Sequence, residues 1–432
     1  MSSLISRVKN KLESQDGFLK SVTVLVGGTA FAQGLGVLAL PFLTRLYTPL
    51  DFSLLAVYMS LVGIVAVVSN LRFEIAIPLP KDNSDALSLL ILAIISNLFI
   101  TILLTIIIFF FKDSLITIIK QPQIESYIWL IPIGVFFSGF YNAFQFWTTR
   151  QKKFGIISRT RISQSISGIS VQLFLGFIGI TPLGLLLGHV INLSAGILSL
   201  IKAFLDDFRN TYRYLSIKKI RLNLKKYQDF PKYSTFEALA NHSAGQLPII
   251  IIAAVAIGPE AGYLLLASKV MAIPVKLIGN AVSQVFLAHA PEEYSKGRMK
   301  LYTINCIVRI MKIGGVPLIL ICFISPFVFP IVFGKEWERA GEMVLWMLPW
   351  FLLQLITSPV SLSLHIMSLQ KVALVLQIFG FALRVGGLLI FAKYFSSSVF
   401  EYYALSGFIF YLIYLIVILR YIRISDLTMK EV

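Results

Sequence analysis

The chain has 432 residues, of which 57% are hydrophobic and only 14% are charged, whereas a soluble domain carries about 25% charged residues. This composition excludes a soluble enzyme or binding domain and predicts an integral membrane protein with many spans. The formal charge of +17 does not indicate nucleic-acid binding, because the lysines and arginines lie between hydrophobic segments, where a membrane protein carries its cytoplasmic charge.

The cysteines and histidines give no sign of a metal or cofactor site. Cys306 and Cys322 fall in one apolar run, where a single helix would hold them too far apart for a disulfide. No two of the four histidines have the spacing of metal ligands; they stand at His189, His242, His289 and His365. We therefore predict no metal, no cofactor and no catalytic residue.

Hydrophobic segments long enough to cross a bilayer recur about twelve times along the chain. They lie at residues 19–42, 52–76, 87–111, 127–147, 156–179, 182–204, 234–257, 262–287, 304–333, 342–366, 372–394 and 400–421. This pattern predicts an all-α polytopic membrane protein with about 12 transmembrane helices, arranged as two six-helix lobes around a central cavity. The fifth segment is the most polar, so we expect its helix to be buried inside the bundle.

The longest polar connection divides the spans six and six. It covers residues 205–233, is rich in lysine and arginine, and is expected to form a helix on an anionic membrane surface. We thus predict an amino-terminal lobe at 1–204, a basic cytoplasmic linker at 205–233 and a carboxy-terminal lobe at 234–432. A faint repeat, in which the turn at 48–55 aligns with that at 258–265, supports two halves inserted in the same direction.

The basic residues also predict the orientation of the chain. On a topology with an even number of spans, most of them collect on one side: in the amino-terminal segment, in the cluster at 150–161, in the linker at 205–233 and in the turn at 296–300. An excess of lysine and arginine marks the cytoplasmic side of a membrane protein. Both termini are therefore expected in the cytoplasm.

The first span contains a run of small residues between Gly27 and Gly36, which also includes the polar side chain of Gln33. Small residues allow helices in a membrane to approach closely. We interpret the run, with Gln33, as a helix-packing surface at which the helix can also flex during transport.

The second span ends in the stretch Asn70–Pro80, where Arg72 and Glu74 come before Pro78 and Pro80 stop the helix. An ionisable group at membrane depth costs about 2.5–3.5 kcal/mol on insertion scales, so it usually faces a polar cavity or a partner. The alternative is that both side chains reach the headgroup zone, where Arg72 contacts phosphate and Glu74 is solvated. Position alone leaves both interpretations open.

Of the basic residues inside the predicted spans, we single out six, namely Arg72, Lys269, Lys276, Arg309, Lys312 and Arg384. Of the acidic residues, only Glu74 is an obvious partner for this set. Buried positive charge without matching acids requires an anion or water, so the set predicts a water-filled cationic cavity for a negatively charged substrate. The alternative, that some of these side chains lie near a span end and reach the headgroups, applies most to Arg309 and Lys312.

Several motifs resemble those of bacterial polysaccharide-biosynthesis flippases. The stretch from Leu40 to Pro49, followed by Asp51 and Phe52, is similar to their first loop, and residues 72–80 (Arg-Phe-Glu-Ile-Ala-Ile-Pro-Leu-Pro) resemble their most recognisable motif. Their second half begins with patterns that match residues 230–234, 246–248, 258–259 and 278–286. The resemblance spans most of the chain.

The resemblance implies a member of the multidrug/oligosaccharidyl-lipid/polysaccharide exporter (MOP) superfamily. Such a protein would translocate an undecaprenyl-pyrophosphate-linked oligosaccharide from the cytoplasmic to the outer leaflet of the bacterial cytoplasmic (inner) membrane, for O-antigen, capsule or exopolysaccharide synthesis. Coupling to an H⁺ or Na⁺ gradient is also implied. The expected partners are membrane lipids, a polysaccharide polymerase and other assembly proteins, with no nucleic acid.

The candidate site residues have two sources. Arg72 and Glu74 stand on the family motif, where a proton- or cation-responsive switch and a structural ion pair are both open, and Arg72 is also a candidate for substrate binding. The substrate-binding candidates of the second half come from charge alone and are Lys269, Lys276, Arg309, Lys312 and Arg384. Their positive charge fits the pyrophosphate of the implied substrate.

Two other functions compete with a flippase. A cation-coupled multidrug exporter of the same superfamily fits less well, because its substrates are often cationic and the basic residues would repel them. A membrane-embedded glycosyltransferase or polymerase needs acids or bases that project into an aqueous loop or domain. The acidic turn with Glu336, Glu338 and Glu342 is instead interpreted as a solvated loop.

Overall fold

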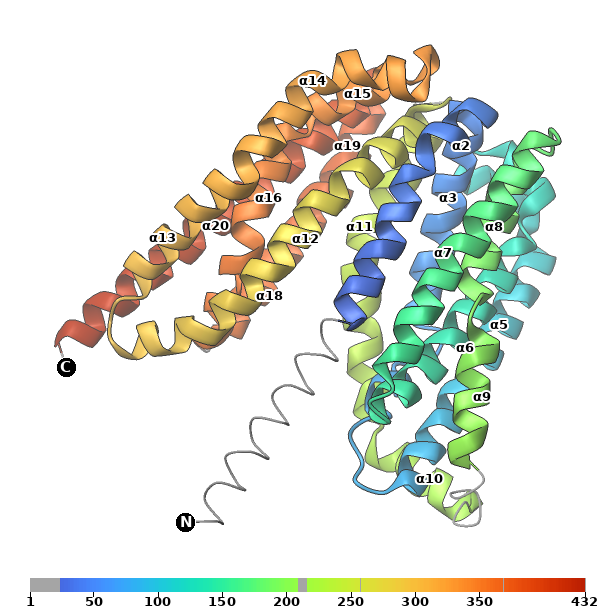
Figure 1. Ribbon diagram of the computed structural model, residues 1–432, viewed down its shortest axis with the longest axis horizontal. Coiled ribbons are helices and arrows are strands. Elements are labelled where there is room, and N and C mark those ends of the chain that lie inside the picture. Colours follow the sequence, from blue (N-terminus) through green and yellow to red (C-terminus); the bar gives the residue numbers. More distant parts are fainter. Residues whose placement is uncertain (1–23, 209–215, 257, 368, 432) are drawn as a thin grey trace. The chain divides into compact units, whose positions relative to one another are not determined.

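The computed structural model describes residues 24–208, 216–256, 258–367 and 369–431, and these residues form helices and turns without a β-strand (Figure 1). The helices of the first half are residues 24–38, α2 (Leu40–Leu46), α3 (Pro49–Ala66), α4 (Phe73–Ala76), α5 (Asn83–Ile119), α6 (Leu130–Arg150), α7 (Phe154–Phe177), α8 (Leu183–Ser194), α9 (Ile197–Phe208) and α10 (Ile217–Lys226).

The second half continues with ten more helices. They are α11 (Thr235–Val255), α12 (Glu260–Ser295), α13 (Met299–Ile310), α14 (Val316–Phe333), α15 (Glu338–Trp346), α16 (Leu348–Val360), α17 (Leu362–Ile366), α18 (Gln370–Phe381), α19 (Gly387–Tyr394) and α20 (Val399–Glu431). Short π-helical turns lie at Phe230–Ser234, Met311–Gly315 and Ala382–Gly386. The last two join α13 to α14 and α18 to α19 without a break.

The all-α, many-span prediction is confirmed. Among the described residues, eight helical segments are long and apolar enough to cross a membrane, or nine if the bent pair of α15 with α16 and α17 counts as one span. Three further predicted spans correspond to α6, α7 and α12. Helix α7 contains the polar segment that the sequence singled out.

The chain folds as two compact units. Among the described residues, the first consists of those within 24–46, 61–117 and 122–242, and the second of those within 47–60, 118–121 and 243–431. Helix α3 is thus shared, its first twelve residues packing in the second unit. The predicted lobe boundaries at 204 and 234 stay a prediction.

Each unit has its own apolar core. In the first unit α6, α7 and α8 pack against one another (Figure 1), and the buried cluster there includes Phe73, Leu90 and Trp147. In the second unit α16 packs against α12 and α20, and the core there includes Phe286 and Ile418.

The predicted second span ends ten residues early. Helix α3 stops at Ala66, and Leu71 and Arg72 then adopt left-handed backbone conformations with φ of 48° and 61°. Residues with a β-carbon rarely adopt this conformation, which persists only where the surrounding structure enforces it. Here Phe73 is buried in the core and the Asn70 side chain donates a hydrogen bond to the Gly139 carbonyl (2.9 Å). Sequence periodicity contains no signal for such a break.

The basic linker contains the predicted helix, α10, which is docked on the first unit. Lys219 forms an ion pair with Asp85 at the start of α5 (3.4 Å), and Asn223 donates to the same carboxylate (3.1 Å). The apolar side chains of Ile217, Leu222 and Leu224 are exposed beside the lysines. A helix with exposed apolar and basic groups suits a membrane surface, although contact with lipid stays a prediction.

Arg339 ties three helices of the second unit together. Its guanidinium contacts the carboxylates of Glu342 on α15 (3.1 Å), Glu260 on α12 (3.4 Å) and Glu401 on α20 (2.6 Å). Only Glu342 belongs to the acidic turn that the sequence suggested was solvated. One guanidinium thus bridges three acids at the junction of these helices.

We predict that Arg339→Met lowers the free energy of unfolding by about 2 kcal/mol, because three carboxylates lose a charged hydrogen-bond donor and repel one another. Thermal unfolding of the purified protein in detergent measures the change. Lys335→Met is the matched control, since Lys335 is exposed and makes no ion pair among the described residues. Equal melting temperatures for the two variants would contradict a stabilising role for Arg339.

Candidate functional site

The first unit contains a polar pocket with a volume of about 580 Å³. Its walls come from the helix at 24–38 and from α6, α7 and α8. Amide and hydroxyl side chains predominate among the polar groups, and Arg161 is the only charged residue of the lining. We call this site the polar pocket; its polar lining residues are Thr29, Gln33, Gln145, Thr149, Arg161, Gln164, Ser165 and Asn192.

Arg161 is fixed by neutral groups. Its Nη2 donates to the side-chain carbonyl of Gln145 on α6 (2.6 Å), and its guanidinium carbon lies 5.3 Å from the ring centre of Tyr141. Tyr141 in turn is hydrogen-bonded to Thr160 through their hydroxyl groups (2.8 Å). Arg161 makes no ion pair with an acid among the described residues, so its side chain is oriented but its charge is not neutralised.

Close packing of the first helix against α7 forms one side of the polar pocket. A β-carbon at Gly28 would lie 1.8 Å from the Ser158 hydroxyl oxygen, so only glycine permits this approach. One turn further on, the Ser165 hydroxyl donates to the Ala32 carbonyl (2.8 Å). The predicted packing role of the small-residue run is thus confirmed at Gly28, whereas Gln33 lines the pocket.

Sequence reasoning missed Arg161, because it was grouped with the cytoplasmic basic cluster at 150–161. One signal was available: Arg161 precedes Gln164 and Ser165 by three and four residues, so the three side chains share a face of one helix. The neighbouring Arg159 does not line the pocket and is exposed.

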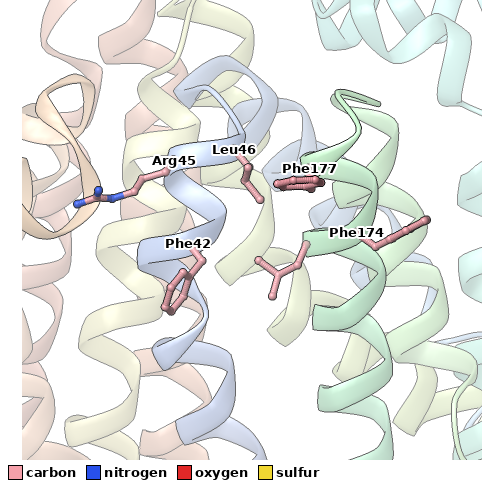
Figure 2. A pocket seen from close by; sticks show the side chains of 6 residues that line it. Phe42, Arg45, Leu46, Phe174 and Phe177 are labelled. Atoms are coloured by element: carbon pink, nitrogen blue, oxygen red, sulfur yellow. The ribbon is translucent and has the colours of Figure 1, made fainter.

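A second concave site, which we call the apolar groove, lies between α2 and α7. It has a volume of about 490 Å³, and its lining residues are Phe42, Arg45, Leu46, Leu173, Phe174 and Phe177. Figure 2 shows Phe177 close to Leu46 across the groove, whereas the guanidinium of Arg45 extends away from both phenylalanines of α7. The groove is therefore apolar.

Arg72, at the end of the segment that joins α3 to α4, forms an ion pair at 3.4 Å with Glu74 in the first turn of α4. The Glu74 side chain is only 6% exposed and that of Arg72 is 25% exposed. One carboxylate oxygen of Glu74 and the Nε of Arg72 are buried without a hydrogen-bond partner. The ion-pair interpretation is thus supported by geometry, and the switch stays a prediction.

The five cations predicted in the second half differ in exposure. Lys276 on α12, Arg309 at the end of α13 and Lys312 are exposed, whereas Lys269 on α12 and Arg384 are partly buried. None of the five makes an ion pair with an acid in the described parts of the chain. That all five face one water-filled cavity remains a prediction.

Arg384 is held by aromatic side chains in the second unit. Its Nη2 donates to the Tyr403 hydroxyl (2.8 Å), and its guanidinium carbon lies 4.7 Å from the ring centre of Trp350. The hydroxyl of Tyr402 donates to the Leu383 carbonyl (3.2 Å) in the same π-helical turn. This is the same arrangement as at Arg161, a guanidinium oriented by neutral groups.

Lys312 and Arg384 lie in two similar π-helical turns, Lys312 as the second residue of Met311–Gly315 and Arg384 as the third residue of Ala382–Gly386. The sequences are Lys312-Ile-Gly-Gly and Arg384-Val-Gly-Gly, and each basic residue lies within a π-helical turn in mid-span. Such turns are rare and occur often at functional sites. The shared pattern of a basic residue, a β-branched residue and two glycines was a signal that our sequence analysis did not use.

Comparison with known proteins decides the family. The family described as polysaccharide biosynthesis protein matches residues 42–342, which is most of the chain. The chain belongs to the polysaccharide biosynthesis protein family. This confirms the resemblance found in the sequence motifs. No curated protein matches the chain closely enough in sequence to count as a relative.

Solved structures with low sequence identity share the fold of this polysaccharide biosynthesis protein. Lipid II flippase MurJ in an inward closed conformation superimposes with a TM-score of 0.70 at 16% identity, over 94% of this chain and 90% of that one. An inward-facing multidrug resistance MATE family transporter of the MOP superfamily gives 0.62 at 16% identity, over 95% of both chains. A MOP superfamily transporter from Pyrococcus furiosus gives 0.53 at 14% identity, over 95% of both chains.

The chain thus belongs to the polysaccharide biosynthesis protein family, as the sequence motifs suggested, and has the fold of the MurJ and MATE structures. Its apolar helices and this fold indicate a multi-pass membrane protein. Neither comparison assigns the substrate or the coupling ion.

We predict that the Arg72–Glu74 pair behaves as a coupled unit. Arg72→Met should lower the free energy of unfolding by about 2 kcal/mol or more, because it leaves a buried carboxylate without its partner. The double variant Arg72→Met/Glu74→Gln should recover most of that loss. A double-mutant cycle of thermal unfolding measures the coupling, and additive effects of the two substitutions would argue against a structural ion pair.

Proposed function

We propose that this protein flips an undecaprenyl-pyrophosphate-linked oligosaccharide from the cytoplasmic to the outer leaflet of a bacterial cytoplasmic membrane, for O-antigen or other surface polysaccharide. The observation that carries the proposal is the polar pocket. Its lining combines amides and hydroxyls with a single arginine, which forms no ion pair with an acid in the described part of the chain. Membership of the polysaccharide biosynthesis protein family supports the same substrate class.

The chemistry of the polar pocket suits a sugar phosphate. Amide and hydroxyl groups both donate and accept hydrogen bonds, as sugar hydroxyls require. A guanidinium binds phosphate oxygens with paired N–H donors, and Arg161 is already oriented by Gln145 and Tyr141. The pocket therefore supplies one positive charge for the pyrophosphate and neutral groups for the saccharide.

The cations of the second unit provide further positive charge for the pyrophosphate. Lys269, Lys276, Arg309, Lys312 and Arg384 remain our candidates there, together with Arg72 in the first unit. In this proposal the two units move relative to each other in alternating access, and an H⁺ or Na⁺ gradient drives the cycle. Glu74, buried beside Arg72, is the candidate for sensing the coupling ion, and no cofactor takes part.

The proposal includes an orientation and partners. Both termini lie in the cytoplasm, because the basic segments collect on that side. Membrane lipids surround the spans, and a polysaccharide polymerase with other assembly proteins receives the flipped unit.

A cation-coupled multidrug exporter is the second candidate, since MATE transporters share the fold. The polar pocket argues against it, because Arg161 would repel a cationic drug. A glycosyltransferase or polymerase would instead need carboxylates in an aqueous site, and the acidic residues around Arg339 are used in ion pairs.

We predict that Arg161→Ala lowers flipping about tenfold or more, because charged hydrogen bonds contribute about 1.5–3 kcal/mol each. The measurement is the lipid-linked saccharide that accumulates in the cytoplasmic leaflet of a strain in which the variant replaces the wild-type protein. Arg159→Ala is the matched control, because Arg159 lies on the same helix but is exposed outside the pocket.

The two variants separate the candidate functions. Accumulation of complete single units with Arg161→Ala but not with Arg159→Ala supports the flippase. Shortened chains on the outer leaflet with normal flipping would indicate a polymerase. Normal polysaccharide with both variants at wild-type protein levels would overturn the role of the polar pocket.

We also predict that the double variant Lys276→Ala/Arg384→Ala abolishes surface polysaccharide while the protein remains in the membrane. Both substitutions remove positive charge that no acid neutralises among the described residues. Immunoblots of membranes establish the protein level, and staining of surface polysaccharide gives the readout. Unchanged polysaccharide would exclude these two cations from the substrate path.

A further inference from the structure

The apolar groove has no role in a site for sugar and phosphate, yet it exposes three large aromatic side chains. Phe42 is 63% exposed, Phe174 is 65% exposed and Phe177 is 83% exposed. Phe42 comes from α2 and the other two from α7, and all three line one concave surface; Figure 2 shows the Phe177 ring turned towards α2 and the Phe174 ring turned away from it. Arg45 is the one charged residue of the lining, and its guanidinium extends away from the groove, so the concave surface itself is apolar and suits a flexible hydrocarbon chain.

The groove and the polar pocket lie along the same two helical segments. The pocket is lined by residues 25–36 of the first helix and 154–165 of α7, and the groove by residues 42–46 and 173–177 that follow in the same segments. With a rise of 1.5 Å per residue, the centres of the two sites are roughly 20 Å apart along one seam. Along both helical segments the polar pocket therefore comes first and the apolar groove second. An amphiphile has the same sequence of parts, a polar head followed by a hydrocarbon chain.

We propose that the apolar groove binds the polyprenyl chain of the lipid-linked substrate while the polar pocket holds its head. This inference rests on the proposed function, because it needs a substrate with a polar head on a long hydrocarbon chain. It adds a docking surface for the chain, which would otherwise extend freely into the bilayer.

The proposed orientation places the chain in the direction of a lipid in the cytoplasmic leaflet. With the amino terminus in the cytoplasm, residues 25–36 lie in the cytoplasmic half of the first span and Phe42 lies towards the opposite surface. A lipid of the inner leaflet holds its head at the cytoplasmic side and points its chain towards the bilayer centre. The pocket lies at the depth of such a head, and the groove lies at the outer end of the same span, so a chain that extends from the pocket to the groove crosses the bilayer centre.

The groove acts mainly by orienting the chain. Lipid tails are as apolar as phenylalanine, so transfer from bilayer to groove gains little hydrophobic free energy. The remaining favourable free energy of binding comes from packing contacts between the chain and the aromatic rings, and it is small. We therefore expect preferential occupancy by the chain when the head is bound, rather than tight binding of any hydrocarbon.

Site-specific photo-crosslinking tests the proposal. The photoreactive residue benzoylphenylalanine replaces Phe177 or Phe42 in the full chain, in vesicles containing undecaprenyl-pyrophosphate-linked saccharide labelled on the saccharide. Phe110 on α5 is the matched control, since it is 71% exposed in the same unit and does not line the groove. The exposure of Phe42 and Phe177 makes these replacements compatible with folding, and Phe174 offers a third position.

We expect labelling at positions 177 and 42 to exceed labelling at 110 at least fivefold. Unlabelled undecaprenyl pyrophosphate should compete, and an equal amount of added phosphatidylglycerol should not. Arg161→Ala in the position-177 variant should lower the labelling, because loss of the head contact releases the chain. Equal labelling at all three positions, or equal competition by phospholipid, would overturn the proposal.

The outcomes distinguish this inference from the proposed function. If Arg161→Ala blocks flipping but position 177 is not labelled above position 110, the groove proposal fails and the flippase stands. If position 177 is labelled preferentially but flipping does not depend on Arg161, the groove binds lipid and the role of the polar pocket is wrong.

Discussion

A guanidinium at membrane depth has to be hydrated, paired or hydrogen-bonded, because the bilayer core supplies no partner for it. The protein meets this constraint in the same way twice. Arg161 is oriented by Gln145 and the ring of Tyr141, and Arg384 by Tyr403 and Trp350. Neutral groups orient both side chains and no acid neutralises them in the described structure, so each arginine keeps its charge for an anionic ligand.

The two units differ in how they supply polar chemistry. The first unit gathers amides and hydroxyls around one arginine in a pocket, next to an apolar groove on the same helices. The second unit distributes lysines and arginines along α12, α13 and the two π-helical turns. Such a division would suit a substrate with a neutral saccharide, a charged pyrophosphate and a hydrocarbon chain, because each part meets a surface of its own character.

The sequence predicted those features that depend on the residues of one span. It did not predict those features that depend on contacts with another helix. The spans follow from runs of apolar residues, and the close approach at Gly28 follows from the small-residue run. The break after Ala66 does not, because burial of Phe73 and the bond from Asn70 to Gly139 enforce left-handed residues there. Arg161 was assigned to the cytoplasmic surface because periodicity cannot tell which neighbouring helix covers a face.

Composition and charge pattern by themselves determined an all-helical membrane protein with two halves, and the motifs determined its family. These properties are local, because a span is recognised from the hydrophobicity of its own residues and a motif from its own short sequence. Only the tertiary structure decided that α6, α7, α8 and the first helix enclose a polar pocket, and that Phe42 and Leu46 of α2 line one groove together with Phe174 and Phe177 of α7. Both sites depend on contacts between helices far apart in the chain, and one sequence does not contain the positions of such contacts.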